Sequence, residues 1–91
     1  MKVKWFSEAV KDLNQIYEYY ETENIRAAAR LYNTIVQETG KLKSNPYIAA
    51  VEQILEDCPE AYRSLVVAKG RYKVVYYIEG GVIYIVHIFA C

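Results

Sequence analysis

The residues with side chains suited to chemistry gather in the last third of the chain. From Glu60 onward the sequence holds only two acids but four cations, Arg63, Lys69, Arg71 and Lys73. This third is therefore locally positive, although the zero net charge of the whole chain argues against non-specific coating of nucleic acid. The single histidine is His87, and histidine is the residue type most often used as a general base at neutral pH. It alternates with Ile83, Ile85 and Phe89, which is typical of a half-buried, hydrogen-bonded histidine rather than a general base.

Length and composition limit the class of protein. The 91 residues form one domain, 1–91, and 54% hydrophobic with 24% charged residues is typical of a folded globular chain. The apolar run at 82–91 is far shorter than the roughly 20 residues that span a bilayer. The N-terminus has no apolar signal stretch, so we expect the protein in the cytoplasm. Cys58 and Cys91 lack metal-ligand spacing, so we expect two reduced thiols and no metal or cofactor.

Two helices are predicted in the first half, after a short strand at 2–6. Ser7 could cap the first helix, whose apolar stripe has helical spacing: Ala9, Leu13, Ile16, Tyr17 and Tyr20. Polar residues at 22–24 break this stripe, and a second one follows at Ile25, Ala28, Tyr32, Ile35, Thr39 and Leu42. Pro46 ends the second helix, because the residue before a proline is disfavoured in the helical region. So short a link makes the two helices an antiparallel hairpin.

Three strands are predicted in the second half, at 62–68, 72–79 and 82–89, because these segments are rich in Val, Ile and Tyr. Gly80 and Gly81 separate the last two strands and permit the positive φ angles of a tight hairpin turn. The segment 47–60 fits a short helix at Ile48, Val51 and Leu55 or a surface linker equally well. The order β-α-α-β-β-β predicts an α+β fold, with the helical hairpin on one face of an antiparallel sheet.

The last strand is apolar on both of its faces. Strict alternation places one set on one side, Val82, Tyr84, Val86 and Ile88, and the other set opposite, Ile83, Ile85, His87 and Phe89. In the preceding strand, Tyr77 shares a side with Lys73. The helices can cover only one face of the sheet, and a bare apolar patch of this size is unusual on a monomer. We therefore expect the other face to be covered by a partner protein, by a homodimer through the last strand, or by a loop folded back over it.

Three segments carry a resemblance that spans essentially the whole chain. They are "WFSEAVKDL", which opens the first helix, "AAARLYNTIVQETGKLKSNP", a second helix closing on a proline, and "YRSLVVAKGRYKVVYYIEGGVIYIV", with a strand, a basic-aromatic step and the hairpin. Together they resemble the RelE/ParE superfamily of toxins from type II toxin–antitoxin systems. The resemblance implies a growth-inhibiting toxin of the plasmid-stabilisation type, held inactive by a cognate antitoxin that lies in its apolar grooves.

The superfamily has two branches, which these motifs do not separate. One branch cuts messenger RNA on the ribosome with basic side chains on the open face of the sheet, and the other poisons DNA gyrase. The resemblance places phosphate contacts at Arg63 and Lys73, but Leu65 stands where many of these nucleases carry another base. The nuclease's remaining arginine or histidine and its tyrosine lie at or beyond the last strand. This sequence stops at Cys91, so we expect that it is shortened or that the protein lacks such a tail.

RNA cleavage by a 2′-hydroxyl needs a proton acceptor, a proton donor and cations to hold the phosphate. The planar guanidinium of Arg63 matches phosphate oxygens, and Lys73 could assist it. Proton transfer is less well provided for. Lysine and tyrosine have unperturbed pKa values of about 10.4 and 10, so they shuttle protons poorly at pH 7. The incomplete basic set favours a toxin that binds a protein target such as DNA gyrase. The alternatives are a ribosome-dependent mRNA endoribonuclease of the RelE type and an inactive small homodimeric domain. Partner contacts are expected at Tyr77, Tyr84, Val86 and Ile88.

Overall fold

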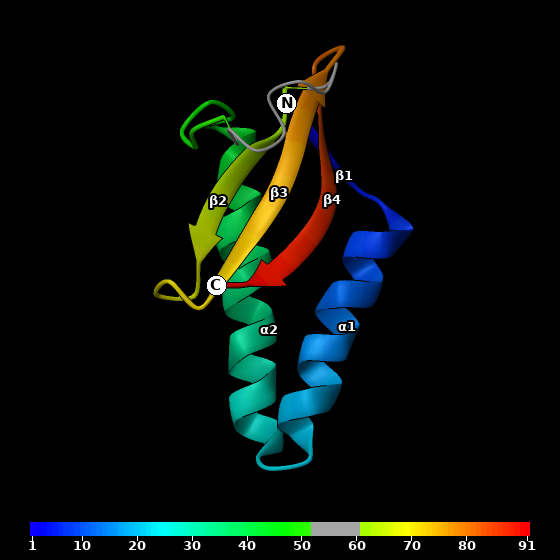
Figure 1. Cartoon of the computed structure of the whole chain (residues 1–91), viewed down its shortest axis with the longest axis vertical. Helices are drawn as coiled ribbons and strands as arrows, with labels where there is room; N and C mark the ends of the chain where they lie inside the picture. Colours follow the sequence, from blue (N-terminus) through cyan, green and yellow to red (C-terminus); the bar gives the residue numbers. More distant parts are fainter. Residues whose placement is uncertain (52–60) are drawn as a thin grey trace.

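A helical hairpin packs against a four-stranded sheet in the computed structural model, which describes residues 1–51 and 61–91 (Figure 1). In chain order the elements are β1 (Lys2–Trp5), α1 (Ser7–Glu21), α2 (Ile25–Gly40), the 3-10 helix η1 (Lys41–Lys43), β2 (Arg63–Val67), β3 (Tyr72–Glu79) and β4 (Val82–Ala90). The predicted order of elements is confirmed. The segment 47–60 fitted either a short helix or a linker; its residues 47–51 are not helical, and 52–60 lie outside the described residues.

The two helices begin in different ways. Asn24 caps α2, because its side-chain oxygen accepts a hydrogen bond from the backbone N–H of Ala27 at 3.0 Å. Ser7 was predicted to cap α1, but it is already the first helical residue, and the N-cap is Phe6, whose side chain makes no capping bond. The reason lies in the sheet: the backbone N–H of Phe6 donates to the carbonyl of Ile85 at 2.9 Å, so extended chain continues up to Phe6 and the helix starts directly after it.

The sheet has the strand order β1-β4-β3-β2. The three C-terminal strands form the predicted antiparallel meander, whereas β1 lies parallel to β4, which makes the sheet mixed. Gly80 and Gly81 form the turn between β3 and β4 with φ angles of +57° and +75°, as the hairpin prediction required. Because β1 pairs only with Val82 to Ile85, the second half of β4 has no strand on that side within residues 1–51 and 61–91.

A bulge in β4 changes which side chains face the helices. Val75 pairs with His87 while Tyr76 pairs with Ile85, so Val86 is an extra residue in the ladder. Strict alternation along this strand is therefore wrong beyond Ile85. The extra residue turns Ile88 into the core beside Ile83 and Ile85, and it puts His87 and Phe89 on the same side as Tyr84.

The helical hairpin lies against one face of the sheet, as Figure 1 shows, and the core fills the space between the two layers. Its fully buried side chains include Ile35 from α2, Tyr76 from β3, and Ile83 and Ile85 from β4. The hydroxyl of Tyr76 donates to the carbonyl of Pro46 at 2.9 Å, so this phenol is paired although it is buried. The hydroxyl of Thr39 is also fully buried, but it has no hydrogen-bond partner within the described residues.

Candidate functional site

Aromatic side chains gather on the face of the sheet that the helices do not cover. Tyr77 and Tyr84 lie opposite each other on β3 and β4, and their rings stack with centroids 5.0 Å apart and planes 24° apart. Phe6 packs edge-on against both rings, at 6.2 and 5.8 Å, and Tyr62 packs edge-on against Tyr77 at 5.6 Å. We call these four residues the aromatic cluster. Rings held together in this way form a rigid apolar surface with hydroxyl groups that can hydrogen-bond a partner.

A hollow of about 480 Å³ lies beside the aromatic cluster; it is lined by Phe6, Glu8, Tyr62, Val75, Val86, His87 and Phe89. Its floor is apolar, because Val75 and Val86 are more than nine-tenths buried there. Phe89 forms part of its rim and is 47% exposed, with its ring stacked on His87 at a centroid distance of 5.3 Å. We call this face, with the aromatic cluster and the hollow, the open face. It provides the apolar surface that the sequence predicted, on a different set of β4 residues.

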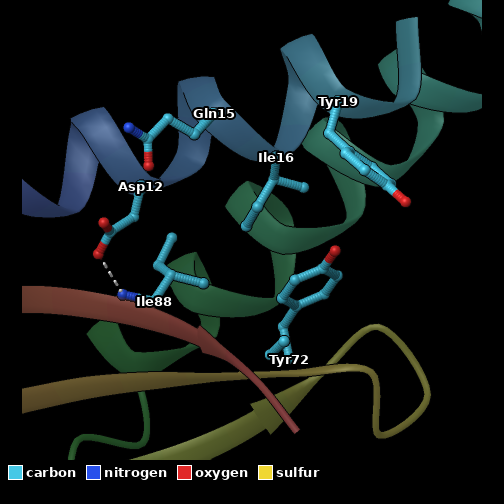
Figure 2. Close-up of a pocket in the computed structure, with 7 residues that line it drawn as sticks. Asp12, Gln15, Ile16, Tyr19, Tyr72 and Ile88 are labelled. Carbon is cyan, nitrogen blue, oxygen red and sulfur yellow. Dashed lines mark hydrogen bonds between the residues drawn. The ribbon is translucent and has the colours of Figure 1, made fainter. Parts of the chain in front are cut away.

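Asp12 on α1 secures the end of β4. One of its carboxylate oxygens, Oδ2, accepts a hydrogen bond from the backbone N–H of Ile88 at 2.9 Å (Figure 2). The same oxygen lies 3.0 Å from Nδ1 of His87. The carboxylate thus hydrogen-bonds the backbone of β4 beyond the point where its pairing with β1 ends. His87 has a hydrogen-bond partner and a side chain 43% exposed, which confirms that it is a half-buried, hydrogen-bonded histidine.

The two cations expected to contact a phosphate lie on opposite faces of the sheet. Arg63 is in register with the core residue Tyr76. Its guanidinium donates to the carbonyl of Ala49 at 2.7 Å and lies over the ring of Tyr47, 5.1 Å from the centroid. Lys73 is in register with Phe89, which belongs to the open face. Arg63 therefore orders the chain around residue 49, and the structure does not bring the two side chains together.

The four residues expected to contact a partner separate into two groups. Tyr77 and Tyr84 form the centre of the aromatic cluster, and Val86 is in the floor of the hollow beside it. Ile88 instead faces α1 and is only 5% exposed, because the bulge turns it into the core. Sequence reasoning missed Phe6, Tyr62 and Asp12. The two aromatic residues carry no periodic signal of their own, and Asp12 is separated from its partner Ile88 by 76 positions.

A second hollow, of about 240 Å³, lies between α1 and the end of β4, where Ile16, Tyr19 and Tyr72 surround an apolar space (Figure 2). The hydroxyl of Tyr72 lies 3.5 Å from the hydroxyl of Tyr20, which also accepts a hydrogen bond from Arg71 at 2.8 Å. Burial raises the pKa of Tyr72 to about 12. The hydrogen bonds from Tyr72 and Arg71 lower the pKa of Tyr20, because they stabilise its phenolate. These groups tie α1 to the start of β3.

Comparison with solved structures places this architecture among known folds. A structure described as a chromosomal ParDE TA system from P. aeruginosa superposes with a TM-score of 0.82 at 23% sequence identity; the match covers 99% of this chain and 95% of that one. At this identity the likeness shows a shared fold. None of the helices in the described residues is long and apolar enough to cross a membrane.

The sequence itself matches a family model over residues 3–90, that of the ParE toxin of type II toxin-antitoxin system, parDE. The chain therefore belongs to the ParE toxin family, and the resemblance to the RelE/ParE superfamily is confirmed. It is the toxin component of a type II toxin–antitoxin module, and its partner is a cognate antitoxin. No curated protein matches the sequence significantly.

Proposed function

We propose that this toxin inhibits growth in the cytoplasm by binding a protein target such as DNA gyrase, and that it does not cut RNA itself. The observation that carries the proposal is the separation of Arg63 from Lys73. A scissile phosphate would need both cations on one face, and Arg63 is instead held by the carbonyl of Ala49 and the ring of Tyr47. Loss of one such charge-stabilising group typically costs a catalytic site about 3 to 4 kcal/mol of barrier.

The chemistry of the open face supports a protein contact. Aromatic rings dominate protein interfaces, because they bury a large apolar area while losing little conformational freedom. The stacked pair Tyr77 and Tyr84 lies beside a hollow with an apolar floor, an arrangement that suits insertion of a partner side chain. Tyr77, Tyr84 and Val86 are therefore the residues we propose for partner binding, and Ile88 supports them from the core.

The test combines two assays on the purified toxin. In a supercoiling assay with DNA gyrase, the unmutated toxin should inhibit the enzyme. A Tyr84→Ala variant should inhibit at least about tenfold less, as expected for loss of a central interface residue. Transcripts on translating ribosomes should stay intact. Lys11→Ala, on the exposed side of α1, is the matched control and should inhibit fully.

Two outcomes would overturn the proposal. Cutting of transcripts that is abolished by Arg63→Ala and by Lys73→Ala would identify a ribosome-dependent ribonuclease. A protein that neither slows growth nor inhibits gyrase, and that sediments as a homodimer dissociated by substitutions in β4, would identify an inactive dimeric domain.

A further inference from the structure

A basic pocket shares no lining residue with the open face. It has a volume of about 350 Å³ and is lined by Ala27, Arg30, Leu31, Thr34, Ala68, Lys69 and Arg71. Three of these residues are cations and none is an acid. They come from two elements far apart in the sequence, α2 and the β2–β3 turn, so the fold gathers the positive charge of the C-terminal third beside Arg30.

The β2–β3 turn is held in a specific shape. Ala68, Lys69 and Gly70 have successive positive φ angles of 53°, 55° and 85°. Glu38 of α2 fixes the start of the turn, because its carboxylate accepts the backbone N–H of Ala68 at 2.8 Å. That acid lines a different hollow. The left-handed conformation is costly for residues other than glycine, so the turn keeps it only because its surroundings hold it there.

The three cations differ in how firmly they are held. Arg71 donates to the hydroxyl of Tyr20 at 2.8 Å and lies over that ring, 5.2 Å from the centroid. Arg30 and Lys69 are exposed, and across residues 1–51 and 61–91 neither has a carboxylate within ion-pair distance. Two of the three charges are therefore available to a ligand, and the third is pre-oriented.

The floor of the basic pocket is apolar and buried. Leu31 and Ala68 are more than nine-tenths buried, and Ala27 is partly buried beside them. An apolar floor with a cationic rim suits a peptide segment that combines a small apolar side chain with flanking carboxylates. Single-stranded nucleic acid is typically bound by cations together with aromatic rings on which its bases stack, and no aromatic residue lines the basic pocket among the described residues. The ring of Tyr20 already has the guanidinium of Arg71 over it.

We propose that the basic pocket receives an acidic segment of the cognate antitoxin. A small apolar side chain of that segment rests on Leu31 and Ala68, and its carboxylates pair with Arg30, Lys69 and Arg71. The contact lies away from the open face, so it does not depend on which cellular target the toxin has. It gives the complex a second attachment site and accelerates association by electrostatic attraction.

The test uses the antitoxin encoded beside the toxin gene, purified with the toxin and then separated from it. The double variant Arg30→Gln/Lys69→Gln leaves the contact between Arg71 and Tyr20 intact, so its fold should be preserved. Its dissociation constant for the antitoxin should rise about tenfold at low salt, mainly through slower association, because each exposed ion pair contributes at most a few-fold. The difference should shrink toward zero in about 0.5 M NaCl. Lys11→Gln is the matched single-charge control.

The proposal is overturned if the double variant, with an unchanged circular dichroism spectrum, binds the antitoxin within twofold of the unmutated toxin at low salt. It is also overturned if the double variant loses affinity for a single-stranded RNA oligonucleotide but keeps its affinity for the antitoxin. That result would identify a nucleic-acid contact. Growth inhibition by the variant without antitoxin should be unchanged. Loss of that inhibition would instead implicate the basic pocket in target binding.

Discussion

Removing the carboxylate of Asp12 should loosen the end of β4 and destabilise the whole fold. This carboxylate accepts the backbone N–H of Ile88 at 2.9 Å, beyond the end of β1, so no strand in the described part of the chain can replace the lost bond. A hydrogen bond to a charged group contributes about 1.5–3 kcal/mol, and a part-buried donor left unpaired adds a desolvation cost. The side chain of His87 is 43% exposed, so its contact with Asp12 adds at most about 1 kcal/mol. We expect Asp12→Ala to lower the free energy of unfolding by about 2 kcal/mol.

Urea denaturation at neutral pH, followed by circular dichroism, measures this difference. Asp12→Asn should be intermediate, because its amide oxygen can still accept the Ile88 N–H but carries no charge. His87→Ala should cost less than about 1 kcal/mol. For a chain of this size, 2 kcal/mol corresponds to a fall in melting temperature of roughly 10 °C. Exchange of the Ile88 amide hydrogen should also accelerate in Asp12→Ala.

The matched control is Glu18→Ala, which removes an exposed carboxylate from the same helix. Its free energy of unfolding should stay within about 0.5 kcal/mol of the unmutated protein. If Asp12→Ala differs from this control by less than that amount, the carboxylate does not secure β4, and the strand end must be stabilised by side-chain packing.

Two further predictions concern buried polar groups. Thr39→Val should raise the free energy of unfolding by about 1 kcal/mol in urea denaturation. The substitution keeps the side-chain shape and removes a buried hydroxyl that has no partner within the described residues. A loss of stability would instead show that the hydroxyl has a partner. The raised pKa of Tyr72, about 12 against about 10 in the unfolded chain, keeps the folded state protonated after the unfolded state has ionised. Stability conferred by this group is therefore complete below pH 10 and should fall by about 2 kcal/mol between pH 10 and pH 12. Tyr72→Phe should flatten that fall, whereas an equally steep fall in the variant would assign it to another group, such as the buried Tyr76, whose pKa is also raised by burial.

Features set by neighbouring residues could be predicted from the sequence. The apolar spacing of both helices and the Gly80–Gly81 turn involve contacts within a few positions, and the structure places all of them close to where they were expected. The shared side of Lys73 and Tyr77 also followed from alternation, because β3 contains no extra residue. The toxin family was recognisable because its motifs are also short, continuous segments of the sequence.

Features set by distant residues could not be predicted in this way. Nothing near Lys2–Trp5 indicates that this strand pairs in parallel with β4, and its extension through Phe6 is why Ser7 is not a cap. The position of Arg63 depends on the carbonyl of Ala49, fourteen residues earlier, so alternation could not show that its charge is used inside the fold. The basic pocket likewise joins Arg30 to a turn almost forty positions later.

The bulge at Val86 decides what each face of the sheet presents. Ile83, Ile85 and Ile88 all belong to the core, and a strand with period two cannot bury residues spaced by two and then by three. The extra residue resolves this conflict, and it carries His87 and Phe89 to the open face. There the ring of Phe89 forms the rim of the hollow, while the ring of His87 stacks on it and reaches Asp12. A single extra residue thus completes the core and builds the apolar surface proposed for a partner, so mutations that remove the bulge should damage stability and binding together.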